Sequence, residues 1–367
     1  MTEEKNNKIE NSILIAGGYG VVGQQIAEAI RANHPELPIV IAGRNPEKGQ
    51  ALADSLGNAS VLSLNMEQSN PLKNSKPRAV LAAVNDPNNY LLIDAIQKGI
   101  PYLDITRWTE RLREAVEVAK KENLKAPVMF SSAWMAGVAA VVARELTKDT
   151  KSINNIDISV LYSLKDKAGP NSTEYMDHLA TPFEVIINGE SKQVCPYTDP
   201  KKITFPSGYS AKAYRFDTPD QFTLPKTTNA KTVSARIAFD DAISTWLLVM
   251  LTRSGLWKLF SGERFKSLRQ SILFNPGKGA KHEIVIEAQG TVHTAKPVQL
   301  RATVLAPKGQ THLAAVGAAI QLDRLLGIDG APAPSPSIVF PDTAPQTSHA
   351  LSVLRAFGIE VKMESLA

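Results

Sequence analysis

The sequence predicts an α/β fold with a parallel sheet, joined to a second domain of the α+β class with a mainly antiparallel sheet. In the first 150 residues, short apolar runs alternate with helical patterns, which is typical of βαβ units. Further along the chain, Ile156, Ile158, Val160 and Tyr162 alternate with polar residues. This period of two indicates half-buried antiparallel strands.

The first expected domain covers residues 1–150 and contains most of the parallel sheet. Ala79 to Val84 includes no polar residue, so this strand is expected to be buried on both faces. Gly99 is expected to end a helix in the left-handed conformation. Strands are expected over 13–16, 39–42, 61–64, 79–84, 102–105 and 128–130, and helices from Val21, through 91–96 and over 110–123.

The rest of the chain is expected to form an inserted domain, residues 151–306, and a C-terminal segment, residues 307–367. Residues 196–225 are rich in Pro, Lys and Thr and are expected to form loops over a cleft. The C-terminal segment shows two helical patterns, which end at Gly327 and Gly358. We expect this segment to pack back on the first domain.

The composition excludes several classes of function. The net charge is +5, but the 41 Lys and Arg residues are scattered among 36 Asp and Glu residues, so no nucleic-acid surface is expected. The single cysteine, Cys195, allows no intrachain disulfide, and the N-terminus lacks the apolar core of a signal peptide; both favour the cytoplasm. No His, Cys and Asp cluster has metal-ligand spacing, so no metal is expected.

The most apolar stretch, Ala242 to Leu251, is about half as long as a membrane-spanning helix. Its apolar surface is also too wide to leave in water. We therefore expect residues 242–260 to lie between the subunits of a homodimer and not to enter a membrane.

A glycine motif points to a dinucleotide. Gly18-Tyr19-Gly20-Val21-Val22-Gly23 matches the G-x-G-x-x-G pattern between a strand and an amphipathic helix. Gly18 would allow the tight turn, Gly20 would let a pyrophosphate approach the backbone, and Gly23 would bring the helix close to the strand. The alternative is a glycine-rich turn without a ligand. The motif predicts a Rossmann-type dinucleotide-binding domain.

The end of the second strand favours NADP over NAD. NAD enzymes usually carry Asp or Glu there, which binds the ribose 2′-hydroxyl. This chain has Gly43, Arg44 and Asn45 instead. A guanidinium can bind a 2′-phosphate with two hydrogen bonds. Alternatively, Arg44 is a solvated surface residue.

Three runs of residues resemble the saccharopine dehydrogenase-like (saccharopine reductase-like) family. They are residues 13–23, residues 42–48 (Ala-Gly-Arg-Asn-Pro-Glu-Lys) and residues 99–106 (Gly-Ile-Pro-Tyr-Leu-Asp-Ile-Thr). Residues 336–341 and 354–362 also look like the end of that family. The resemblance covers both ends of the chain, whereas residues 151–306 match loosely.

The resemblance implies a Rossmann domain completed by the C-terminal segment, and an inserted domain that holds the substrate and often the dimer contact. Known members reduce an imine formed from an amine and a carbonyl compound, or catalyse the reverse reaction. Where the family often has Asp after the third strand, this chain has Asn65, and its usual Gly-Pro is replaced by Asn85-Asp86-Pro87. The resemblance places Gly18, Tyr19, Gly20, Val21 and Val22 at the phosphates, Arg44 and Asn45 at the 2′-phosphate, and Ala83, Val84 and Asn85 near the ribose or nicotinamide.

Three residues are candidates for the chemistry. Tyr102 and Asp104 share one face at the carboxyl end of a parallel strand, where Asp104 could bind a substrate ammonium or act as a base. Alternatively, Asp104 caps the following turn. His178 could act as a general acid, or be a plain surface histidine. We expect an NADP-dependent oxidoreductase acting on a C–N or C=O bond of a small amino-acid- or amine-like substrate, or else a non-catalytic NADP(H)-binding structural or sensor protein.

Overall fold

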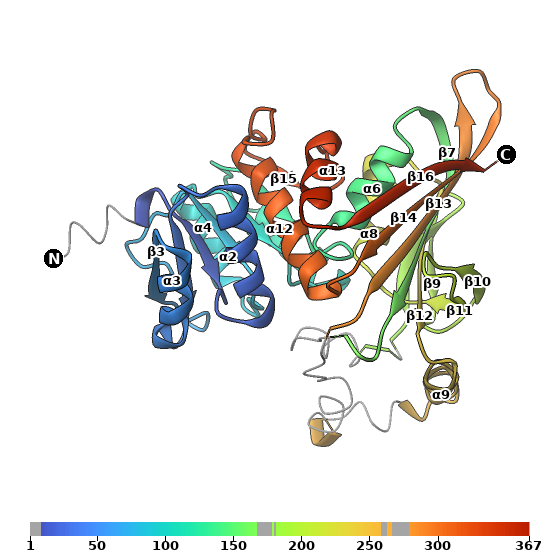
Figure 1. Cartoon of the computed structure of the whole chain (residues 1–367), viewed down its shortest axis with the longest axis horizontal. Coiled ribbons are helices and arrows are strands. Elements are labelled where there is room, and N and C mark those ends of the chain that lie inside the picture. The colour runs from blue at the N-terminus through green and yellow to red at the C-terminus, as the bar shows by residue number, and fades with distance from the viewer. Residues whose placement is uncertain (1–8, 167–177, 180, 258–262, 266–278, 367) are drawn as a thin grey trace. The chain divides into compact units, whose positions relative to one another are not determined.

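The computed structural model describes residues 9–166, 178–179, 181–257, 263–265 and 279–366. The chain folds into two compact units. Unit 1 comprises Met1–Ser132 and Ala314–His349, and unit 2 comprises Ala133–Leu313 and Ala350–Ala367. Figure 1 traces the chain through its elements. Each unit contains its own large sheet, so each is described in turn.

Unit 1 contains a seven-stranded parallel sheet in the order β15-β6-β5-β4-β1-β2-β3. The first six strands have the 3-2-1-4-5-6 order of the Rossmann fold, as predicted. The order reverses between β1 and β4, and ligands of open α/β sheets bind at such a point, beyond the carboxyl ends of the strands. The strands are β1 Ile13–Ala16, β2 Ile39–Gly43, β3 Ala59–Ser63, β4 Ala79–Ala82, β5 Tyr102–Asp104, β6 Val128–Phe130 and β15 Ile338–Val339.

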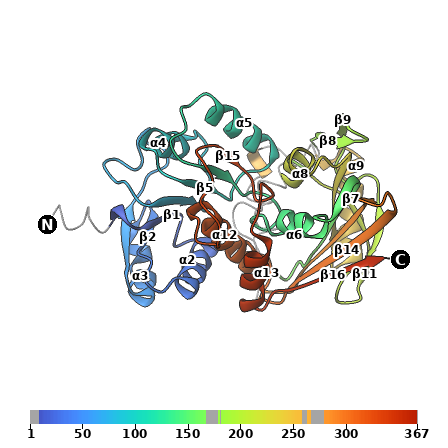
Figure 2. The same cartoon turned by 90° about the horizontal axis from the view of Figure 1, so that it is seen from above.

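Amphipathic helices cover this sheet because their apolar residues recur on one side. Ile26, Ala27 and Ile30 of α2 are fully buried, and every residue of β1 and β4 is buried, as the apolar runs predicted. Gly99 has a φ of +65° and ends α4, so its predicted role is confirmed. The elements are α2 Val21–Asn33, the 3₁₀ helix η1 Pro46–Gly49, α3 Gln50–Leu56, α4 Tyr90–Lys98 and α5 Thr109–Lys120 (Figure 2).

Unit 2 contains a second seven-stranded sheet, in the order β10-β11-β12-β7-β13-β14-β16. Its strand pairs are antiparallel except β7 with β12, which is parallel, so the predicted fold class is confirmed. The strands are β7 Thr150–Tyr162, β10 Lys201–Thr204, β11 Ser210–Arg215, β12 Thr232–Phe239, β13 His282–Val292, β14 Pro297–Ala306 and β16 Glu360–Leu366. Unit 2 also contains α6 Val138–Leu146, the hairpin β8 Phe183–Ile187 and β9 Glu190–Val194, α8 Asp220–Thr228, α9 Ala242–Arg253 and η2 Glu263–Phe265.

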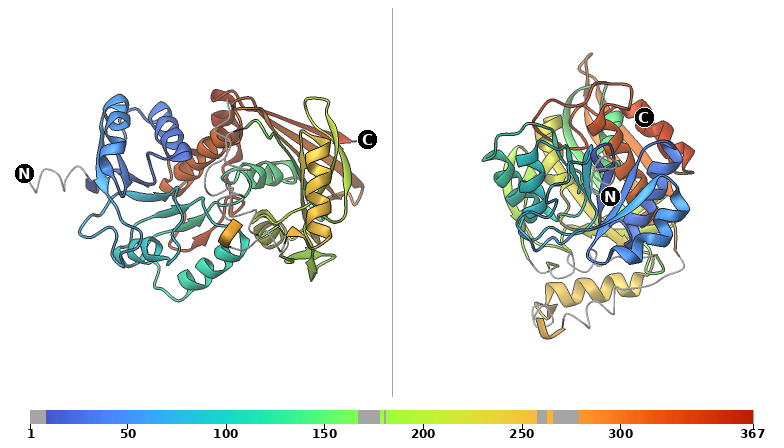
Figure 3. Two further views of the ribbon diagram at one scale, coloured as in Figure 1. Left: turned by 90° about the horizontal axis from the view of Figure 1, so that it is seen from below. Right: turned by 90° about the vertical axis from the view of Figure 1, so that its left-hand side faces the viewer.

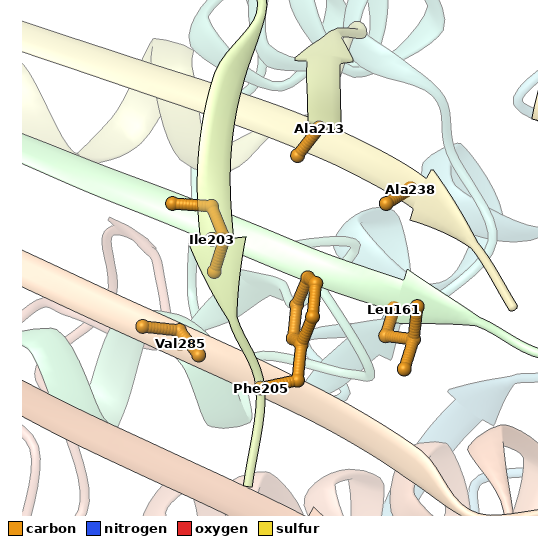
Figure 4. Close-up of a cluster of buried hydrophobic side chains, with 6 residues drawn as sticks. All are labelled: Leu161, Ile203, Phe205, Ala213, Ala238 and Val285. Atoms are coloured by element: carbon orange, nitrogen blue, oxygen red, sulfur yellow. The ribbon is translucent and has the colours of Figure 1, made fainter. Parts of the chain in front are cut away.

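Residues 196–225 are not the loops that their composition predicted. They include the hairpin of β10 and β11, which crosses one face of the sheet, and the start of α8. Figure 4 shows Ile203 and Phe205 pointing toward Leu161 and Val285 of the long strands. The prediction was wrong because apolar residues at alternate positions give this hairpin a buried face, whatever its Pro and Lys content.

The C-terminal residues divide differently from the expected single segment. Residues 314–349 belong to unit 1, where β15 extends the parallel sheet and Asp323 on α12 (Gln310–Leu326) contacts His34, with 2.7 Å between Oδ1 and Nε2. Residues 350–367 belong to unit 2, and the segment passes through α13 (Thr347–Ala356) before β16 pairs with β14. A strand at a sheet edge has unpaired backbone groups, and β16 satisfies those of β14.

Helix α9 leaves most of its apolar side chains exposed. Ile243, Trp246, Leu247 and Met250 are 75%, 61%, 50% and 48% exposed, whereas Val249 is buried. The carboxylate of Asp241 caps the helix by accepting a hydrogen bond from the Ser244 N–H at 2.7 Å. The helix is gold in Figure 3 and lies at the periphery of its unit. In the described part of the chain, no helix combines the length and the apolar character needed to cross a membrane.

Candidate functional site

The glycine-rich turn follows directly on β1. Gly17 has a φ of +79°, and its carbonyl oxygen accepts a hydrogen bond from the Gly20 N–H at 2.9 Å. The backbone N–H groups of Gly17 and Gly18 donate to the carbonyl of Ala42 on β2. Gly17 therefore supplies the left-handed residue of the tight turn that was predicted for Gly18. Gly18 is needed for space instead, since a Cβ there would lie 2.9 Å from the carbonyl oxygen of Ile15.

The other two glycines of the motif differ in what surrounds them. A Cβ on Gly23 would lie 2.2 Å from the Gly17 carbonyl oxygen, so α2 and the turn touch there. A Cβ on Gly20 would have one neighbour, the same oxygen, at 3.2 Å. Gly20 is exposed and is the N-cap of α2, with no side chain capping the helix. The N-terminal N–H groups of α2 are therefore available to an anion, which fits a dinucleotide pyrophosphate.

Tyr19 connects this turn to the end of β2. Its ring covers Gly43, where a Cβ would lie 2.5 Å from the Tyr19 Cε1 atom, and its hydroxyl oxygen accepts a hydrogen bond from the Asn45 N–H at 3.1 Å. Arg44, between these two residues, is exposed and has no hydrogen bond or ion pair to any described residue. Arg44 thus lies between two residues that contact Tyr19 of the glycine-rich turn, and its guanidinium has no partner among the described residues.

The remaining cofactor candidates follow β3 and β4. The Ala83 N–H donates to the carbonyl of Ala16 at 2.9 Å, and Val84 lies over Gly17, whose Cβ would come within 2.8 Å of the Val84 Cβ. The loop after β4, which continues into Asn85, therefore borders the turn. Asn65 follows β3, and its side-chain oxygen accepts a hydrogen bond from the Glu67 N–H at 3.0 Å, which stabilises a turn.

Asp104 is completely buried at the end of β5, and its carboxylate accepts four hydrogen bonds. The Tyr102 hydroxyl and the Arg107 Nε donate to Oδ2 at 2.9 and 2.8 Å, and the backbone N–H and the hydroxyl of Thr106 donate to Oδ1, both at 2.8 Å. Burial, and then the charge of Asp104, raise the pKa of Tyr102 well above its usual value. The contact with the Thr106 N–H favours the alternative in which Asp104 caps the following turn.

Arg107 is a functional candidate that the sequence patterns did not indicate. It is 4% exposed, and its guanidinium also donates to the Asn89 side chain and lies 5.7 Å from the centre of the Phe130 ring. Burial by itself lowers the pKa of Arg107, but Asp104, Tyr102 and Asp86 together outweigh it, so the pKa is raised and the side chain is charged. The spacing of three residues between Asp104 and Arg107 was a visible signal, whereas the burial of the pair was not.

His178 belongs to unit 2, whereas Tyr102 and Asp104 belong to unit 1. The His178 backbone carbonyl accepts a hydrogen bond from the Thr181 N–H at 2.9 Å. Its neighbour Asp177 lies outside the described residues. Across the ranges that the structure describes, no group of three or more His, Cys, Asp or Glu residues could hold a metal ion.

The contrast between Gly20 and Gly23 generates a paired prediction. Gly20→Val should leave the protein folded but abolish dinucleotide binding, because the branched side chain would occupy the space in front of the α2 N-terminus. Gly23→Val should prevent normal folding, because its Cβ has no space. Circular dichroism, thermal melting and a cofactor titration test both variants. A folded Gly20→Val variant that binds with unchanged affinity would show that the motif is only a turn.

Comparisons with known proteins agree with this geometry. Residues 13–134 match the family model described as the saccharopine dehydrogenase NADP binding domain. Among solved structures, the apo saccharopine dehydrogenase (L-Glu forming) from Saccharomyces cerevisiae is 13% identical, with a TM-score of 0.67, over 97% of this chain and 100% of that one. Comparison with curated proteins gives no match.

Two further solved structures are more distant. A myo-inositol dehydrogenase from Corynebacterium glutamicum is 14% identical, with a TM-score of 0.45, over 97% of this chain and 98% of that one. A putative myo-inositol dehydrogenase from Sinorhizobium meliloti is 12% identical, with a TM-score of 0.45, over 97% of this chain and 99% of that one.

The similarity to the yeast structure shows a shared fold, and the family model identifies the parallel-sheet unit as a domain that binds a nicotinamide cofactor. The predicted family and the predicted enzyme class are therefore confirmed. Residues 13–134 thus correspond to the NADP-binding domain found in the saccharopine dehydrogenase family, and the whole chain shares its fold with one saccharopine dehydrogenase.

Proposed function

We propose that this protein uses NADP(H) to transfer a hydride to or from a C–N bond (imine or amine) or a C=O bond of a small amino-acid- or amine-like substrate. The bound cofactor would supply the hydride in its reduced form and accept it in its oxidised form. The observation that carries the proposal is Arg44, an exposed residue that has no partner among the described residues and follows Gly43, which packs against Tyr19 of the glycine-rich turn in a matched NADP-binding domain. The bond class and the substrate class rest on the family resemblance.

The choice of NADP over NAD follows from the charges at the end of β2. Gly43 stands where a carboxylate would bind the ribose 2′-hydroxyl, and Tyr19 fills the space above it. Arg44 has no intramolecular partner among the described residues, so it loses no existing ion pair when it binds a phosphate. The backbone of Asn45, held by the Tyr19 hydroxyl, supports this arrangement.

Arg44→Gln should remove most of the preference for NADP. A hydrogen bond to a charged group contributes about 1.5–3 kcal/mol, which corresponds to about 10- to 150-fold in affinity. Wild-type protein should therefore bind NADPH more tightly than NADH by this factor in a fluorescence titration. The matched control is Arg78→Gln, which removes the same charge from an exposed residue just before β4, at the opposite end of the strands. Equal affinity of the wild type for both cofactors would contradict the proposal.

The catalytic residues are proposed in two groups. Asp104 and Tyr102 lie at the carboxyl edge of the sheet, but the Asp104 carboxylate is already held by four donors. We therefore assign both residues to the support of the site. His178, in unit 2, is the remaining candidate for the general acid. Its support is the ability of an imidazole to transfer protons near neutral pH.

Turnover is the direct test of this function. The purified protein should oxidise NADPH, followed at 340 nm, with at least one member of a panel of amine and 2-oxo acid pairs, and Gly20→Val should be inactive with the same pair. The saturated Asp104 carboxylate favours the alternative, an NADP(H)-binding structural or sensor protein without turnover. Tight NADPH binding with no oxidation across the panel would support that alternative and contradict the enzymatic proposal.

We also propose a homodimer formed through α9. Ile243, Trp246, Leu247 and Met250 recur at i, i+3, i+4 and i+7, so they form one continuous apolar stripe. A stripe of this width in water favours association, and a second copy of the same helix is complementary to it by symmetry.

The dimer prediction can be checked by analytical ultracentrifugation. Wild-type protein should sediment as a dimer, and Trp246→Glu should sediment as a folded monomer, because a charge in the buried stripe would lose its hydration. Met363→Glu provides the control, since Met363 is another exposed apolar residue of unit 2, on β16. A wild-type monomer would contradict the proposal.

The proposed location is the cytoplasm. Its support is the thiol chemistry of the chain, whose single cysteine, Cys195, is exposed and free. Such a thiol is compatible with a reducing compartment.

A further inference from the structure

Arg107 connects three segments at the carboxyl edge of the unit 1 sheet. Its backbone N–H donates to the hydroxyl of Ser132, beyond β6, at 2.9 Å. Its Nε donates to Asp104 at the end of β5, and its Nη1 donates to the side-chain oxygen of Asn89, in the loop between β4 and α4. Its Nη2 lies 3.9 Å from Oδ2 of Asp86 in the same loop. One buried side chain thus joins β5 to Asp86 and Asn89 of this loop.

The position of the loop formed by residues 83–89 depends on these contacts with Arg107. The Asp86 carboxylate binds the start of α4, and the Asn89 side chain binds Arg107. Asp86 accepts hydrogen bonds from the N–H groups of Tyr90 and Leu92, at 2.9 and 3.0 Å, and so caps α4. Asn89 occupies the N-cap position of α4 with a φ of +57°, but its side chain does not cap the helix and binds Arg107 instead. A guanidinium has several donors in a rigid fork and holds Asn89 and Asp104 in fixed directions, whereas the donors of a lysine ammonium lie on one freely rotating atom.

The positive charge of Arg107 also stabilises the loop, because two buried carboxyl groups, Asp86 and Asp104, lie next to it. Asp86 and Asp104 are 2% and 0% exposed, and burial raises the pKa of Asp86 while Arg107 lowers it. Without the guanidinium, two buried carboxyl groups would face each other without a compensating charge. The loop would then shift or open to water. Arg111, which donates to the carbonyls of Asp86 and Pro87 from outside, does not neutralise this buried pair.

The other end of the loop borders the glycine-rich turn, where Val84 lies over Gly17. We propose that Arg107 is a positioning residue, which fixes the 83–89 loop against the nicotinamide half of the cofactor. This inference rests on the proposed function, in which that loop lies at the ribose or nicotinamide. The adenosine half, with its 2′-phosphate, is proposed to bind at Arg44, where Arg107 has no contact. Loss of Arg107 should therefore weaken the binding of the nicotinamide half of the cofactor and leave the binding of the adenosine half unchanged.

The experiment compares two ligands. NADPH carries both halves, whereas 2′,5′-ADP carries the 2′-phosphate and adenosine but no nicotinamide. Arg107→Met should raise the Kd for NADPH by about 10-fold or more, the lower end of the effects seen when residues that orient a binding group are removed. The Kd for 2′,5′-ADP, measured by calorimetry, should stay within about two-fold of wild type, because that ligand does not reach the loop. Arg107→Lys should not restore NADPH affinity.

The matched control is Arg324→Met. Arg324 also pairs with a buried carboxylate of unit 1, Asp329, at 2.9 Å, but it does not touch the 83–89 loop. This variant should lower the melting temperature and leave both Kd values unchanged. If Arg107→Met does not fold, Asn89→Gly serves instead, since glycine keeps the positive φ and removes only the oxygen that accepts from Arg107.

The outcomes separate the inference from the function it rests on. Selective loss of NADPH affinity supports the positioning role. Unchanged NADPH affinity in a folded Arg107 or Asn89 variant overturns it, and so does equal weakening of both ligands, because that result indicates a general loss of structure. Failure of the wild type to bind NADPH overturns the proposed function itself.

Discussion

The close approach of α2 to the turn after β1 is the constraint on which the candidate site depends. A helix can begin this close to the strand only where residue 23 has no Cβ, because the Gly17 carbonyl oxygen occupies that position. The same approach leaves the N-terminus of α2 uncapped and exposed at Gly20. The pairing of β4 with β1 brings the loop after β4 against the same turn, where a larger residue at Gly17 would collide with Val84. The close contact at Gly23 and the pairing of β4 with β1 therefore bring the helix N-terminus and the loop after β4 to the same turn.

The parts of the fold that were predictable from the sequence are those specified by neighbours in the chain. The strand at 13–16, the helix from Val21 and its glycine motif follow from local periodicity and turn chemistry. The hairpin of β10 and β11 did not, because its burial depends on Leu161 and Val285, which are distant in sequence. The pairing of β16 with β14 was missed for a similar reason, since a free sheet edge exists only after the fold has formed.

The candidate site shows the same division. Gly20, Gly23 and Arg44 could be identified from one motif and its spacing, and the structure finds them at the carboxyl edge of the parallel sheet. The environment of Asp104 could not be predicted. A carboxylate at the end of a parallel strand suggests a base, but its four hydrogen-bond donors include Arg107, which reaches it only because both side chains are buried. Strand position alone therefore placed Asp104 at the carboxyl edge of the sheet but did not indicate the four donors that hold its carboxylate.

Arg44 and Arg107 differ in burial, and this difference suits them to different roles. Arg44 is exposed and has no partner among the described residues, so its charge remains available to an incoming phosphate. Arg107 is buried, and its charge is used on two carboxylates and an amide of the protein itself. An exposed cation can bind and release a ligand at little cost, whereas a buried one is too strongly coupled to its neighbours to do so. Recognition of the cofactor would therefore lie with the exposed arginine, and the shape of the surface that receives it with the buried one.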